Sequence, residues 1–94
     1  MTMLTRLEYP ASAKTVREAA SYILLPSGYR LVDTCPACPP EAREIGDKPP
    51  SPLSLTPQLT SVARGLILIG GSRTAIIVDE QHKAVAYAWD RSAR

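Results

Sequence analysis

The sequence predicts an α+β domain made of two small βαβ-like halves, in which two helices pack on small mixed sheets. Apolar residues recur at helical spacing at 16–24 and again at 59–67, which indicates two amphipathic helices. Two strand-like segments within 74–89 flank a polar turn and indicate a hairpin. A proline-rich stretch at 34–52 separates a strand-helix-strand half from a strand-helix-hairpin half.

The length and composition point to a single domain spanning 1–94. A chain of 94 residues has room for one core, and without Phe that core must consist mainly of Val, Ile, Leu and Ala. The formal net charge of +2 comes from scattered residues, so we expect no nucleic-acid partner. The sequence shows neither a membrane-spanning run nor an export signal. We therefore expect a cytosolic protein or a domain excised from an exported one.

The first half is predicted to be strand, helix and strand. Residues 4–9 alternate loosely, as a short strand does, and the following proline ends it. Thr15 and Glu18 have the spacing of a capping box, in which each side chain accepts a hydrogen bond from a backbone N–H of the first helical turn. The Pro-Ser-Gly sequence at 26–28 ends the helix. We expect a second strand at 29–33 alongside the first, completing a βαβ unit. The helix has one apolar face, formed by Val16, Ala19, Ala20, Ile23 and Leu24.

The segment at 34–52 has a different character from its flanks. It contains six of the nine prolines and no apolar periodicity. Each proline removes a backbone hydrogen-bond donor, which disfavours helix interiors and central strands. We expect a long surface loop with a single turn of helix near 41–44.

The second half opens with a short edge strand at 53–55. Thr56 is then predicted to be the N-cap of the second helix, with Pro57 at its first position. Gly65 inside this helix costs about 1 kcal/mol relative to Ala, which suggests that another element approaches closely there. The Gly-Gly pair at 70–71 ends the helix. Its apolar face is formed by Leu59, Val62, Ala63, Leu66 and Ile67.

The hairpin is predicted to consist of strands at 74–79 and 84–89 joined by an all-polar turn. In the second strand the bulky side chains share one face and the alanines share the other. We expect the bulky face to meet the helices and the alanine face to admit a close neighbour. The bulky set is Val85, Tyr87 and Trp89.

Cys35 and Cys38 form the one motif with evident reactive chemistry. A redox-active CxxC pair normally lies at a helix N-terminus, but two prolines follow the second cysteine here. Two cysteines and one histidine are too few for a zinc site. The remaining interpretations are a local disulfide in an oxidising compartment or two thiols in a reducing one, and we favour the disulfide.

No catalytic, metal-binding or cofactor-binding residues are predicted. His82 is expected to be a solvated turn residue, because no convergent partners accompany it. The glycines at 70–71 follow a helix, so they do not offer an anion the helix N-terminus. Tyrosine and tryptophan need hydrogen-bond partners when buried, so we favour core packing for most of them and a contact surface for some. The candidates for that surface are Tyr9, Tyr29, Tyr87 and Trp89.

The order of these elements resembles the N-terminal region of PilL-type proteins, which occur in type IVB pilus clusters and integrative conjugative elements. The residues that carry the resemblance are TVREAASYIL, SGYRL and the final VD followed by VAYAW. The chain is more broadly similar to the short N-terminal domain of secretins and TonB-dependent receptors. The cysteine loop is a departure from this pattern.

The resemblance implies a non-enzymatic docking domain in the periplasm, excised from an exported protein at the outer membrane. Its partners would be a secretin or other protein components of the pilus or conjugation apparatus, and the isolated domain would be monomeric. The oxidising periplasm agrees with the disulfide at Cys35 and Cys38. Two alternatives stay open: a cell-wall or polysaccharide-binding module that uses exposed Tyr and Trp, and a thiol-dependent redox module that uses the CPAC loop.

Overall fold

The computed structural model describes residues 3–36 and 38–90. Three α-helices, two 3₁₀ turns and two small sheets make up this part of the chain, so the predicted α+β class is confirmed. In chain order the elements are β1 (Leu4–Arg6), α1 (Val16–Leu24), η1 (Leu25–Ser27), β2 (Arg30–Leu31), α2 (Glu41–Asp47), η2 (Pro52–Ser54), β3 (Leu59–Ser61), α3 (Val62–Gly70), β4 (Thr74–Asp79) and β5 (Ala84–Trp89).

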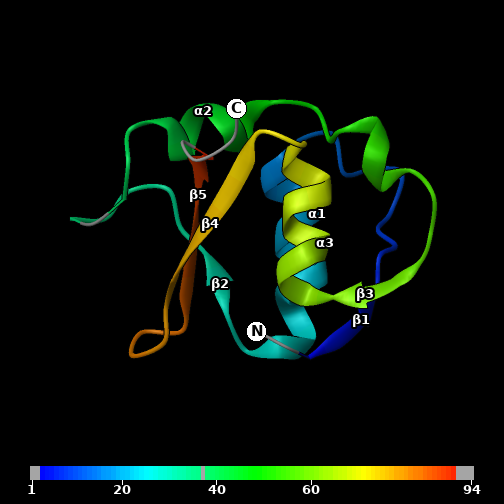
Figure 1. Ribbon diagram of the computed structural model, residues 1–94, viewed down its shortest axis with the longest axis horizontal. Helices are drawn as coiled ribbons and strands as arrows, with labels where there is room; N and C mark the ends of the chain where they lie inside the picture. Colours follow the sequence, from blue (N-terminus) through cyan, green and yellow to red (C-terminus); the bar gives the residue numbers. More distant parts are fainter. Residues whose placement is uncertain (1–2, 37, 91–94) are drawn as a thin grey trace.

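Helices α1 and α3 lie side by side in the middle of the molecule (Figure 1). The mixed sheet β2-β5-β4 lies on one side of them, and the antiparallel pair β1-β3 lies at the other. Helix α2 packs across the end of β5. The core between these elements contains no Phe, and its largest fully buried side chain is that of Tyr87. Its other buried members are Leu7, Val16, Ala19, Ala20, Ile23, Leu24, Ile45, Val62, Leu66, Ile69 and Val85.

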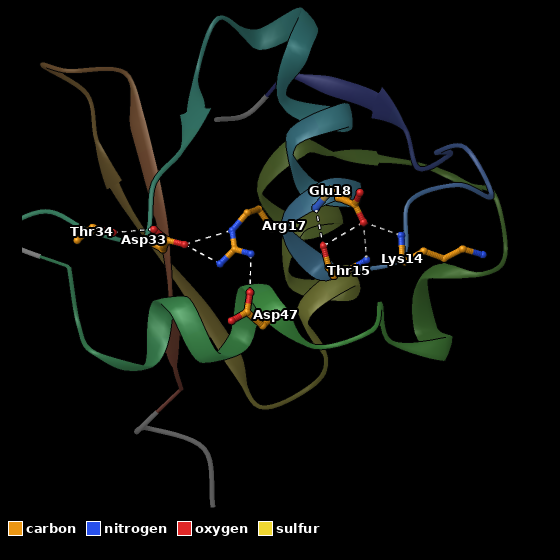
Figure 2. Close-up of polar contacts among 7 residues, drawn as sticks. All are labelled: Lys14, Thr15, Arg17, Glu18, Asp33, Thr34 and Asp47. Atoms are coloured by element: carbon orange, nitrogen blue, oxygen red, sulfur yellow. Dashed lines mark hydrogen bonds and ion pairs between the residues drawn. The ribbon is translucent and has the colours of Figure 1, made fainter.

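The capping box at the start of α1 is confirmed (Figure 2). The Thr15 hydroxyl accepts a hydrogen bond from the Glu18 N–H at 3.2 Å. The Glu18 carboxylate in turn accepts from the N–H of Thr15 at 3.1 Å and of Lys14 at 2.9 Å. These bonds, the one from Lys14 first, hold the pKa of Glu18 below its ordinary value. The predicted apolar face of the helix is buried throughout.

Helix α2 corrects the prediction for the proline-rich stretch. Residues 41–47 were expected to be surface loop with one helical turn, but they form a seven-residue helix. The prolines bracket this helix and leave its interior free, since Pro40 is its N-cap and Lys48 is already extended before the next proline. Ala42 and Ile45 are buried, and Ile45 belongs to the main core.

The predicted pairing of the first two strands is wrong. Strand β1 pairs antiparallel with β3, with Thr5 opposite Thr60. Strand β2 instead pairs parallel with β5, with Leu31 opposite Val85. The strand-helix-strand segment therefore contributes one strand to each sheet, and the two halves of the sequence are interleaved in space.

The start of the second helix also differs from the prediction. Residues 53–55, expected as an edge strand, lie mostly in the 3₁₀ turn η2. Leu59, assigned to the buried helical face, is 71% exposed in β3. The helix begins after Ser61, whose hydroxyl accepts a hydrogen bond from the Arg64 N–H at 3.2 Å. Residues 59–61 therefore form a strand paired with β1, although their local sequence also suits the first turn of a helix.

The end of the chain follows the prediction closely. Strands β4 and β5 have the expected bounds and pair in one antiparallel register, with Ile77 opposite Ala86. Val85 and Tyr87 point into the core, as expected. A close approach at Gly65 is also present: an added Cβ would lie 3.2 Å from Ile23 Cδ1 of α1.

Candidate interaction site

The outer face of the sheet β2-β5-β4 carries two rows of side chains. Strand register places Arg30, Ala84 and Asp79 in one row and sets Ala86 opposite Ile77 in the next. Val32 continues this second row, because its N–H donates to the Val85 carbonyl at 2.8 Å just past the end of β2. Because side chains alternate along a strand, these residues face away from the core that buries Val85 and Tyr87. The row with Ile77 is apolar, and the other row has Arg30 at one end and Asp79 at the other.

A groove of about 510 Å³ lies over this face. Ala84 and Ala86 of β5 form its floor, and Ile77, 43% exposed, lies at its β4 side. The connection between β2 and α2 runs out on the side of the sheet away from α1 and α3 (Figure 1). Residues from the first part of this connection line the groove; they are Val32, Thr34, Cys35, Pro36 and Cys38. The alanine face was predicted to admit a close neighbour, and this loop lies against part of it.

Arg17 of α1 links Asp33, near the start of that loop, to the C-terminal end of α2 (Figure 2). Its guanidinium donates to Asp33, with an Nη2 to Oδ2 distance of 2.6 Å. It also donates to Asp47 of α2, with an Nη1 to Oδ1 distance of 2.6 Å. The Thr34 hydroxyl donates to Asp33 at 2.8 Å, and this bond and then Arg17 hold the pKa of Asp33 below its ordinary value. The start of the loop is thereby held against α1 and α2.

Cys35 and Cys38 are joined by a disulfide in the structure, with their Cα atoms 5.0 Å apart. The N–H of Cys38 donates to the carbonyl of Cys35 at 3.1 Å, so the bridge closes one tight turn. The pair precedes α2, whose first residue is Glu41. The bridge lies in the loop that walls the groove.

Strand β4 has an open edge. Asp90 N–H donates to Arg73 O at 2.7 Å, and antiparallel ladders alternate, so residues 75, 77 and 79 bond to β5. The peptide groups of Ile76 and Val78 therefore point away from the sheet. No strand of the described chain pairs with them. This edge runs beside the groove.

The polar row at one end of the groove contains an ionised carboxylate. Asp79 accepts from the N–H of His82 at 3.2 Å and contacts His82 Nδ1 at 2.7 Å. These contacts hold the pKa of Asp79 below its ordinary value. The Asp79 side chain is 51% exposed, and His82 is an exposed turn residue as predicted. The guanidinium of Arg30 has no ion pair or hydrogen bond within the described residues.

The four aromatic residues predicted as candidates for a contact surface lie in different surroundings. Tyr87 is 1% exposed and donates its hydroxyl to the Leu66 carbonyl, in line with the predicted inward face of β5, so it is not available as a surface candidate. The other three are half-buried and lie apart from the groove, each against a neighbour. The Tyr9 hydroxyl forms a hydrogen bond with the Ser54 hydroxyl at 2.7 Å. The Lys83 ammonium lies 5.1 Å from the centre of the Tyr29 ring, and the Lys48 ammonium lies 5.2 Å from the centre of the Trp89 ring. A polysaccharide-binding module would need exposed aromatic rings, so Tyr87 is not a candidate for that role.

Sequence reasoning missed Arg30, Ile77 and Asp79 as site residues. The alternation within 84–89 was the available signal, because it set an alanine face apart from the core face. The sequence did not predict that β2 would pair with β5 on the side opposite β4. Without that pairing, the residues flanking the alanines could not be named.

Residues 3–36 and 38–90 contain no group of three His, Cys, Asp or Glu side chains placed to hold a metal ion. Within the same residues, no helix has the length and hydrophobicity to cross a membrane. Comparisons of the chain with protein-family models, curated proteins and solved structures find no match.

Proposed function

We propose that this chain is a non-enzymatic interaction domain of a type IV pilus or conjugative-element assembly protein. It acts in the periplasm, as a monomeric domain of an exported protein associated with the outer membrane, and docks a secretin or another envelope component. The resemblance of residues 15–24 and of the closing VAYAW strand to PilL-type proteins supports the assignment to this apparatus. The disulfide of the loop agrees with an oxidising compartment.

The open edge of β4 is the observation that carries the docking role. An extended segment of a partner can add to such an edge through backbone hydrogen bonds, and neighbouring side chains then give specificity. Ile76 and Val78 offer the peptide groups for this addition. Exposed edges also invite aggregation unless a partner or charge covers them. Docking at this edge accounts for a six-residue strand with one free side.

A chemical-shift titration of the labelled domain with the periplasmic domains of the secretin tests the proposal. The expected result is perturbation of the β4 amides. The variant Val78→Pro removes one outward N–H without breaking a bond to β5, so it should retain the fold and lose binding. Val78→Ala is the matched control, because it shortens the same side chain and keeps the N–H.

The proposal is wrong if the secretin domains cause no perturbation at the highest soluble concentration. It is also wrong in its docking mode if Val78→Pro, with an intact fold by its amide spectrum, binds as well as Val78→Ala.

A further inference from the structure

The two rows on the outer face of the sheet continue to the open edge of β4. A strand added there places one residue opposite Ile77, in line with the row Val32, Ala86 and Ile77. Its next residue on the same face, two positions away, stands opposite Asp79. Directly opposed side chains lie about 4.5–5.5 Å apart at Cβ, so both added residues contact the strand.

The apolar row offers room for a large side chain. Alanines at the floor leave the groove of about 510 Å³ open next to Ile77, which is exposed. An aliphatic or aromatic side chain that extends from the added strand over Ile77 would cover Ile77 and enter the groove. A small or polar side chain would leave that apolar surface wet.

The polar row favours a cation on the added strand. Asp79 lies at the β4 end of this row, with its carboxylate half exposed. Arg30 lies at the far end, across β5, and forms no ion pair with Asp79 within the described residues, while His82 contacts the Asp79 carboxylate at 2.7 Å and leaves it half exposed. A Lys or Arg opposite Asp79 is attracted, whereas a carboxylate there is repelled.

We propose that the segment docking on β4 carries a large apolar residue opposite Ile77 and a basic residue two positions away opposite Asp79. This proposal rests on the proposed docking function and names the chemistry of its partner. Read along the partner chain, an antiparallel addition requires the order basic, any, apolar, and a parallel addition requires the reverse order.

Two blocked peptides probe the proposal, Ac-Thr-Lys-Thr-Leu-Thr-Val-NH₂ and its reversed sequence, Ac-Val-Thr-Leu-Thr-Lys-Thr-NH₂, titrated into the folded domain and followed by its amide spectrum. One of the two orders should bind with perturbation of β4 and of Ala86. In that peptide, Leu→Ser should weaken binding about tenfold or more. The change Lys→Glu should weaken it about three- to fivefold.

Variants of the domain test each row separately. Ala86→Leu fills the groove and should reduce the preference for Leu over Ser in the peptide. Ala88→Leu is the matched control on the same strand face outside the groove lining, and it should leave the preference unchanged. Asp79→Lys should reverse the charge preference, so that the Glu peptide binds more tightly than the Lys peptide.

The outcomes separate this inference from the docking function. Binding that is lost in Val78→Pro but indifferent to Leu→Ser and to Lys→Glu overturns the inference and leaves docking at β4 intact. Failure of both peptides to bind a domain that still docks secretin domains at β4 also overturns the inference alone. Failure of the secretin titration itself counts against the proposed function.

Discussion

Replacing the last glycine of α3 should reveal how tightly this helix is packed against the hairpin. A Cβ added at Gly70 would lie 2.7 Å from both Thr74 Oγ1 and Tyr87 Cε1. Non-bonded carbon atoms prefer about 3.5–4.0 Å, so the overlap is close to 1 Å. Neither neighbour can move freely, since the Thr74 hydroxyl donates to the Gly71 carbonyl at 2.7 Å and the Tyr87 ring is buried.

Gly65 in the same helix is the matched control. A Cβ there would meet Ile23 Cδ1 at 3.2 Å and Thr60 Cγ2 at 3.4 Å, and the Ile23 methyl can shift by a few tenths of an ångström. The gain in helix propensity from Gly to Ala is about 1 kcal/mol in a helix interior. Gly65→Ala should therefore lie within about 1 kcal/mol of the parent and tend to stabilise it.

Overpacking costs about 1–3 kcal/mol, and Gly70 ends its helix, so little propensity gain offsets it. We expect Gly70→Ala to lower the free energy of unfolding by about 1–2 kcal/mol. For a domain of this size the melting temperature should fall by about 4–16 °C. Thermal and urea unfolding followed by circular dichroism measure both variants. The reasoning is refuted if Gly70→Ala proves as stable as Gly65→Ala.

Two further predictions concern ionisable groups. Because the pKa of Asp33 is held below its ordinary value, its carboxylate stabilises the fold above about pH 4, and this contribution is lost as the pH falls through the folded pKa. Arg17→Met should cost about 1 kcal/mol at pH 7 and less at pH 2.5 by urea unfolding, with the exposed Arg64→Met as control; an equal loss at both pH values contradicts this account. Burial raises the pKa of Tyr87, so we expect this residue to ionise only when the domain unfolds at alkaline pH. The absorbance at 295 nm reports tyrosine ionisation, and the difference between the parent and Tyr87→Phe titrations isolates the contribution of Tyr87. A stepwise ionisation of Tyr87 in the folded domain would show that its ring is accessible.

The features that the sequence predicted well depend on neighbours a few residues away. The capping box needs Thr15 and Glu18 at fixed spacing within one turn, and both side chains bond as expected. The hairpin needs two alternating runs and a short polar turn, and its bounds were predicted to the residue. In each case the interacting residues are close in the sequence, so the local pattern is sufficient to predict them.

The features that were missed depend on distant partners. Strand β3 forms because β1, more than fifty residues earlier, pairs with it, and its own sequence also suits the start of a helix. Helix α2 was hidden by the prolines around it, although none lies inside it. The helix is stabilised by burial of Ile45 and by the ion pair between Arg17 and Asp47. Both contacts involve residues far away in the sequence, so the local amino-acid composition does not predict them.

The alanine face of β5 connects the missed topology to the proposed site. Alanine has a low preference for strands, and this central strand carries three of them in alternate positions. The opposite face of the same strand carries Val85 and Tyr87 and suffices to anchor it in the core. Small side chains on the outer face therefore add little to the stability of the isolated domain. They do allow a body to approach the sheet closely, and the disulfide loop occupies only part of that space, so the groove between the loop and β4 is the place where such a body fits.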